Sequence, residues 1–194
     1  MSRSKTKPFP QPDEYSCGPA SLKTALEILG THRSFSSISR LCRVTKNGTP
    51  VKKLITVANK LGVAVLAVEW ATLRHLQSAL KPQASQPRAV IVDYLYHDTE
   101  PVENTGHYAA VASYSARNSR IYLLDSHSQT RKSYAWKNFL DRWYDYDYKR
   151  TKTSKPQKYR ISRKWYNRLM LVLARDPRHL PRFRTPTAKL FLPA

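Results

Sequence analysis

The chain has 194 residues and a formal net charge of +21, from 34 lysines and arginines against 13 aspartates and glutamates. A hydrophobic fraction of 41% supports a folded core and excludes a chain that is disordered throughout. Two cysteines are too few for a disulfide framework, the N-terminus lacks the apolar run of a signal peptide, and the most apolar window, residues 54–70, is too interrupted to span a membrane. The composition therefore predicts a cytoplasmic protein, and the length predicts one domain.

The first third of the chain has the apolar spacing of helices. Residues 17–29 follow a helical period, with Pro19 in the first turn and Gly30 where the helix should end. The same period predicts a short helix over 35–43 and another over about 50–61. The front of the chain is thus expected to be a helical layer.

Short runs rich in β-branched and aromatic residues follow. They lie at 63–70, 89–95, 107–114 and 120–125, and a helix is expected between the first two, at 71–80. The third and fourth runs are joined by a short polar segment, which is typical of a hairpin. These runs predict an antiparallel sheet.

The last part of the chain is less regular. It predicts a small helix at 136–146, an exposed basic loop at about 149–164, and a last strand at 168–174. The Pro-rich, basic end, 175–194, is expected to wrap the surface or to be loose. We therefore expect one α+β domain over 1–174, followed by a C-terminal tail.

Cys17 is the first candidate for chemistry. A thiol in the first turn of a helix meets unpaired backbone N–H groups and the positive end of the helix dipole, which favour the thiolate. The alternative is a buried cysteine that serves as a small apolar side chain. Cys42, on the apolar side of the second helix, is assigned to the core on that ground.

His107 and Asp125 are candidates to assist a nucleophile. A cysteine nucleophile needs a histidine to share its proton and a third group to orient the imidazole. His107 opens the third β run and Asp125 closes the fourth, so antiparallel pairing would bring them to the same end of the sheet. Gln11, six residues before Cys17, could join the Cys17 backbone N–H in stabilising an oxyanion.

The positive charge is concentrated near the C-terminus. Residues 149–189 hold 14 basic residues and one acid, Asp176. Such clustering favours a polyanionic neighbour, such as nucleic acid or an acidic protein, although a solvated surface gives the same pattern. Tyr144, Tyr146 and Tyr148 could stack on bases, or pack against the last strand.

Taken in order, these residues match a known pattern. The segment "QPDEYSCGPASL", then "GHYAAV" and then "LLD" after one hairpin resembles the papain-like bacteriocin-processing cysteine peptidases, which cleave double-glycine leaders. The likeness extends over roughly residues 8–174. It implies a papain-like α+β fold, in which an N-terminal helical lobe packs against an antiparallel sheet lobe and the active site lies in the cleft between them.

The resemblance also implies roles. Cys17 would be the nucleophile, His107 the general base and later acid, Asp125 the orienting residue and Gln11 the oxyanion donor, without cofactor or metal. Ser16 and Ser126 depart from the family pattern, and the transmembrane and ATP-binding domains of the transporter relatives are not found in this sequence, so a standalone relative is expected.

The sequence thus predicts a cysteine peptidase that acts on a peptide or isopeptide amide bond. Two alternatives remain open. One is a weak or inactive papain-like module that binds nucleic acid or another polyanion through its basic C-terminal region. The other is acyl transfer with the same catalytic residues.

Overall fold

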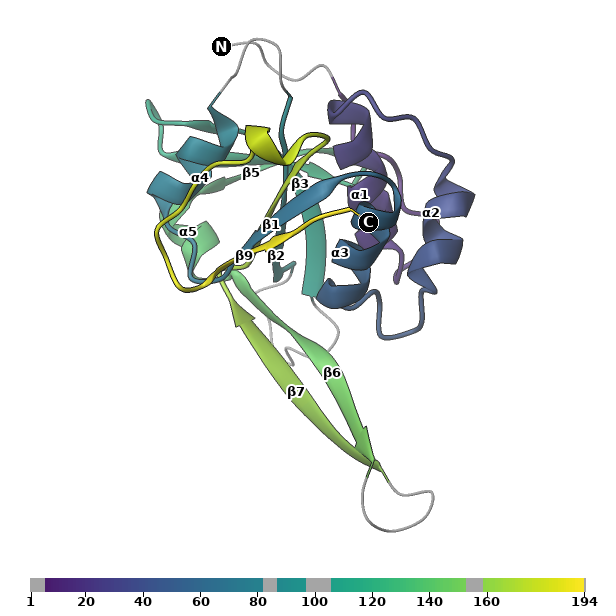
Figure 1. The fold of residues 1–194 in the computed structure, drawn as a ribbon. Helices are drawn as coiled ribbons and strands as arrows, with labels where there is room; N and C mark the ends of the chain where they lie inside the picture. The colour runs from purple at the N-terminus through teal and green to yellow at the C-terminus, as the bar shows by residue number, and fades with distance from the viewer. Residues whose placement is uncertain (1–5, 82–86, 97–105, 153–158, 194) are drawn as a thin grey trace.

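The computed structural model describes residues 6–81, 87–96, 106–152 and 159–193, which form an α+β fold around a seven-stranded sheet (Figure 1). The strand order is β5-β4-β3-β2-β8-β1-β9, and all neighbouring strands are antiparallel. The sheet strands are β1 (Ala64–Val68), β2 (Ala89–Leu95), β3 (Gly106–Ser115), β4 (Arg120–Asp125), β5 (Thr130–Ala135), β8 (Met170–Ala174) and β9 (Ala188–Phe191).

Helices cover both faces of this sheet. In Figure 1, α1 (Cys17–Ile28), α2 (Phe35–Cys42) and α3 (Val51–Lys60) lie on one side, and α4 (Leu73–Leu80) and α5 (Trp136–Leu140) lie on the other. Each side has its own apolar core. Leu22, Leu26 and Leu54 belong to the first, and Leu76, Phe139 and Trp143 belong to the second. The fold class predicted from the sequence is confirmed.

The front helices and the four predicted strands are present at or within two residues of their expected limits. Gly30 and Gly62 adopt positive φ angles of 69° and 78° just after α1 and α3, a conformation that costs glycine little. The antiparallel pairing of β3 with β4 is also confirmed, with Ala110 opposite Leu124.

Three expectations about the last part of the chain were wrong. The helix expected at 136–146 ends at Leu140, because the alternating residues from Tyr144 onward form a strand. The basic segment 149–164 is not a loop where it is described: β6 (Tyr144–Lys152) pairs with β7 (Tyr159–Asn167) in a separate two-stranded ribbon. Residues 153–158 lie outside the described part.

The third correction concerns the end of the chain. The strand expected as the last, β8, is followed by a short 3-10 helix, Pro177–His179, and by β9, which pairs with β1. The end therefore wraps the body and adds an edge strand to the sheet. No helix in the described part of the chain has both the length and the hydropathy to cross a membrane.

Candidate active site

Cys17 is the first residue of α1, as predicted from the helical period. The turn before it is held by Asp13, whose carboxylate accepts hydrogen bonds from the Tyr15 backbone N–H and the Ser16 hydroxyl, both at 2.9 Å. Gly18 gives the helix room to pack, because a Cβ there would lie 3.0 Å from the Cβ of Thr49. One turn into α1, a polar contact joins it to the sheet.

That contact comes from Ser21. Its buried hydroxyl donates to the backbone carbonyl of Tyr108 at 2.7 Å. The Sγ of Cys17 accepts a hydrogen bond from the backbone N–H of the same Tyr108. The thiol therefore lies against β3, one residue along the chain from His107.

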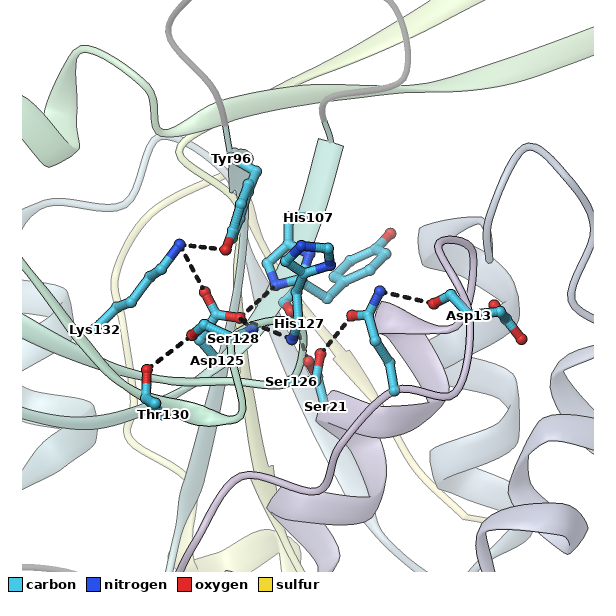
Figure 2. Close-up of polar contacts among 12 residues, drawn as sticks. Asp13, Ser21, Tyr96, His107, Asp125, Ser126, His127, Ser128, Thr130 and Lys132 are labelled. Carbon is cyan, nitrogen blue, oxygen red and sulfur yellow. Dashed lines mark hydrogen bonds and ion pairs between the residues drawn. The ribbon is translucent and has the colours of Figure 1, made fainter.

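His107 and Asp125 are brought together as predicted. The Nε2 of His107 lies 3.6 Å from Oδ1 of Asp125, and both side chains are buried (Figure 2). This is an ion-pair distance and slightly too long for a hydrogen bond, as is common in resting active sites. Since Nε2 faces Asp125, the other ring nitrogen, Nδ1, is the one left for a nucleophile.

Asp125 is fully buried and is held by several donors. Its Oδ1 accepts the backbone N–H groups of His127 and Ser128 at 2.8 and 2.9 Å, and its Oδ2 lies 3.5 Å from Nζ of Lys132. Burial alone would raise the pKa of this carboxyl, but His107, Ser128 and Lys132 outweigh burial and lower it below its usual range. Asp125 is therefore a carboxylate at neutral pH.

The His107 ring sits among aromatic side chains. It makes edge contacts with Tyr94 and Tyr96, at centroid distances of 5.7 and 4.8 Å. Burial lowers the pKa of His107 below its ordinary value, although Asp125 acts in the opposite direction. The imidazole is therefore neutral at pH 7 and able to accept a proton.

Gln11 is tied to the residue that follows Asp125. Its backbone N–H donates to the Ser126 carbonyl at 3.0 Å, and the Ser126 hydroxyl donates to its Oε1 at 2.8 Å. Its Nε2 donates to the Asp13 carbonyl at 2.8 Å. Ser126, a departure from the family pattern, thus fixes the orientation of the Gln11 amide.

The expectation that the Cys17 thiol is acidic in the resting protein was wrong. Burial, with Asp93 and Asp145 acting in the same direction, raises its pKa to about 12, although the N–H groups of Tyr108 and Gly18 act against them. Within the described residues, no hydrogen bond joins Cys17 to His107. The helix start supplies donors, but it does not outweigh burial and two acids.

Asp93 and Asp145 are site residues that the sequence reasoning missed. Asp93 lies within the fully buried strand β2. Asp145 is the second residue of β6 and lies against Gly106, where a Cβ would collide with its carboxylate. A charged residue inside the apolar run "AVIVDYL" was the available signal for Asp93. Nothing local in the sequence marked Asp145.

The remaining candidates lie outside this arrangement or beside it. Cys42 is 1% exposed in the core below α2, as predicted, and burial raises its pKa to about 12. His127 packs its ring against Tyr96 at a centroid distance of 5.2 Å. Among the described ranges, no group of three histidine, cysteine or acidic residues is placed to hold a metal ion.

Known structures share this fold. The peptidase domain of Streptococcus ComA, a bifunctional ABC transporter of a quorum-sensing pathway, superposes with a TM-score of 0.62 at 19% identity, covering 87% of this chain and 98% of that domain. A double-glycine motif protease from an AMS/PCAT transporter, solved with its leader peptide, gives 0.60 at 11% identity over 90% and 94%. The fold is therefore that of double-glycine peptidase domains.

The sequence itself gives the family. Residues 4–151 match the Peptidase_C39-like family, and the chain belongs to it. An uncharacterized protein of Methanothermobacter marburgensis is 40% identical over 58 residues, which are 30% of this chain. The chain spans 41% of the length of that curated relative.

Proposed function

We propose that the protein is a cysteine peptidase that hydrolyses a peptide or isopeptide amide bond through an acyl-enzyme on Cys17. The observation that carries this proposal is the buried pair of His107 and Asp125, 3.6 Å apart, in which His107 comes from β3, the strand that Cys17 contacts, and Asp125 ends the neighbouring β4. The Nε2 of His107 makes no hydrogen bond, and Asp125 has its own donors in the backbone N–H groups of His127 and Ser128. A pair with a purely structural role would not need a neutral imidazole placed in this way. Membership in the Peptidase_C39-like family supports the same reaction class.

The reaction proceeds in two halves. In the first, the Cys17 sulfur attacks the amide carbon while its proton passes to Nδ1 of His107, and the imidazolium then protonates the leaving amine. In the second, water attacks the thioester, gives its proton to His107, and releases the acid and the thiol. Because the resting thiol has a raised pKa, its proton leaves during attack and not beforehand.

Asp125 and Gln11 assist without forming bonds to the substrate carbon. Asp125 holds the His107 tautomer that carries hydrogen on Nε2 and stabilises the imidazolium. Gln11 donates one amide hydrogen to the Asp13 carbonyl, and its second hydrogen is assigned to the oxyanion, together with the Cys17 backbone N–H. The substrate class that we assign is a peptide with small residues before the cleaved bond.

The test compares the two cysteines, since both are buried and both have a raised pKa. Peptides with paired small residues would be incubated with wild type, Cys17→Ala and Cys42→Ala, and the products identified by mass spectrometry. We expect cleavage by wild type and Cys42→Ala, and none by Cys17→Ala. Equal cleavage by the Cys17→Ala protein would overturn the assignment.

Acyl transfer would use the same residues and is distinguished by its products. An added amine nucleophile would appear in the product of a transferase, whereas a peptidase releases the free acid. The alternative of an inactive polyanion-binding module predicts no cleavage of any peptide and no labelling of Cys17 by thiol reagents in preference to Cys42.

A further inference from the structure

The β6–β7 ribbon is a part of the molecule that the proposed peptidase reaction does not use. It leaves the body as a long twisted hairpin, as Figure 1 shows. Nine residue pairs hold its strands in register, from Tyr144 opposite Asn167 to Lys152 opposite Tyr159. An isolated two-stranded hairpin is marginally stable, so the side chains along it must hold it together.

Aromatic side chains gather on one face of the ribbon. Opposite residues of an antiparallel pair share a face, which places Tyr146 with Trp165 and Tyr148 with Arg163. The Tyr146 and Trp165 rings lie 4.8 Å apart, and the Arg163 guanidinium lies 4.8 Å from the Tyr146 centroid. These contacts stabilise the hairpin, yet Trp165 remains 45% exposed and Tyr148 37% exposed.

The ribbon is also strongly basic. Its described residues 148–152 and 159–167 contain six lysines and arginines and no acid. The two acids of β6 lie at its base, where Asp145 packs against Gly106 and Asp147 accepts the Val51 backbone N–H of α3. All six side chains from Arg160 to Trp165 are exposed. The projecting part therefore presents aromatic rings and positive charge without a compensating acid.

We propose that the β6–β7 ribbon binds single-stranded nucleic acid, through the exposed rings of its aromatic face and the basic side chains along both of its faces. Basic side chains neutralise the phosphates, and exposed rings offer stacking platforms to unpaired bases. A duplex conceals its base faces and an acidic peptide has none, so neither accounts for the exposed rings between the cations. The proposal is independent of Cys17 and of the peptidase reaction.

Binding to the wild-type protein is the first test. Fluorescence anisotropy would be followed with labelled oligouridylate, oligothymidylate, a DNA duplex of equal length and polyglutamate. We expect the two single strands to bind more tightly than the duplex or polyglutamate, and the tighter of the two identifies RNA or DNA as the source. Affinity should fall with salt at a log–log slope of roughly −0.7 per phosphate contact.

Two matched pairs of variants locate the site. Lys152→Gln/Arg160→Gln/Arg163→Gln should reduce the magnitude of the salt slope by about 2. The control Arg33→Gln/Arg40→Gln/Lys46→Gln also removes three positive charges, but from exposed positions on the α1–α3 side. It should leave binding within about twofold of wild type. Trp165→Leu should weaken binding by roughly fivefold to a hundredfold, whereas Trp165→Phe, which keeps a ring, should lose much less.

Each outcome decides the question. Equal affinity for duplex and single strands, preference for polyglutamate, or equal loss in both triple variants would overturn the proposal. Cys17→Ala should bind oligouridylate like wild type, so that a failed peptidase assignment leaves this test intact. If a ribbon variant does not fold, tryptophan quenching by the oligonucleotide is measured in Trp70→Phe, which leaves Trp165 as the one tryptophan among the exposed large hydrophobics of the described residues, and an absence of quenching would contradict stacking.

Discussion

The carboxyl groups of Asp93 and Asp145 lie near enough to Cys17 to raise its pKa, and burial raises the pKa of both acids. Asp145 favours the neutral form of Asp93, whereas a hydrogen bond from Asp93 favours the charged form of Asp145, and burial outweighs that bond to leave the pKa of Asp145 at about 6. Two such acids next to a nucleophile work against thiolate formation. The reactivity of Cys17 therefore depends on the protonation of Asp93 and Asp145.

Asp145→Asn is expected to stabilise the protein at neutral pH. The folded protein keeps the Asp145 proton up to about pH 6, whereas the unfolded chain releases it near 3.8, so wild type loses stability as pH rises through this window. The variant cannot titrate there. Its free energy of unfolding should exceed that of wild type by about 1–3 kcal/mol at pH 7, and the two should converge below about pH 4. Urea unfolding across this range would measure the difference.

The same variant should alkylate faster at Cys17, because removal of a nearby negative charge lowers the thiol pKa. Cys42, which the Asp145 carboxyl does not perturb, is the internal control. A stability difference that stays constant with pH, or an unchanged rate at Cys17, would contradict this account of the acid pair.

Gln11→Ala should separate nucleophilicity from catalysis. Alkylation of Cys17 builds no oxyanion, so its rate should be unchanged, while peptide cleavage should slow by about 10²–10³. Ser126→Ala tests the hydrogen bond that orients the Gln11 amide, and it should slow cleavage less than Gln11→Ala does. Wild-type cleavage by Gln11→Ala would make Gln11 a loop residue that only ties the N-terminal segment to Ser126.

Element by element, the sequence pattern was most informative where an element has a buried apolar run. The strands β2 and β4 have their predicted limits because their apolar runs end at turn residues. The strand β5, "TRKSYA", has no comparable apolar run, because it is an edge strand with exposed or half-buried side chains. Its position is fixed by pairing with β4, which local periodicity does not encode.

The candidate site likewise has residues that local sequence predicts and others that only long-range packing brings in. Cys17, His107 and Asp125 could be located because each stands at the end of a recognisable element, and their elements meet as expected. The raised thiol pKa could not be predicted, since Asp145, which acts on the thiol, lies on β6, 128 residues after Cys17 in the chain. Burial and long-range charge appear only when the chain is folded.

The ribbon is joined to the helical layer through Asp147. The helix α3 begins after Pro50, which offers no capping side chain, and both oxygens of Asp147 accept the Val51 N–H instead, at 3.3 and 3.1 Å. The Tyr166 hydroxyl donates to the same carboxylate at 3.1 Å. One carboxylate thus caps a helix and anchors both strands of the ribbon.

Asp147→Ala should therefore lower the free energy of unfolding by about 1–3 kcal/mol, from the lost cap and the unpaired Tyr166 hydroxyl. Tyr166→Phe, which removes only the hydroxyl, should cost less than Asp147→Ala. Hydrogen exchange at Val51 and along β6 and β7 would show whether the loosening is local. A loss of stability without faster exchange at these amides would contradict the anchoring role.

At the scale of the whole molecule, the net charge of +21 acts on stability and on binding with opposite dependence on salt. Repulsion among the basic residues destabilises the compact state, and salt screens it, so the Tm of the free protein should rise by a few degrees between about 0.05 and 0.5 M KCl. A bound single strand also raises Tm, but by mass action, and that increment should vanish over the same range because binding weakens with salt. The curves with and without oligouridylate should therefore converge at high salt.

The Lys152→Gln/Arg160→Gln/Arg163→Gln protein is the control for this prediction. It should lose most of the Tm increment that oligouridylate gives, and keep the rise of Tm with salt that the free protein shows. A Tm increment from oligouridylate that persists at the highest salt would place the contact outside the charged ribbon. A fall of the free-protein Tm with salt would show that ion pairs such as Lys23 with Glu27 outweigh the repulsion among the basic residues.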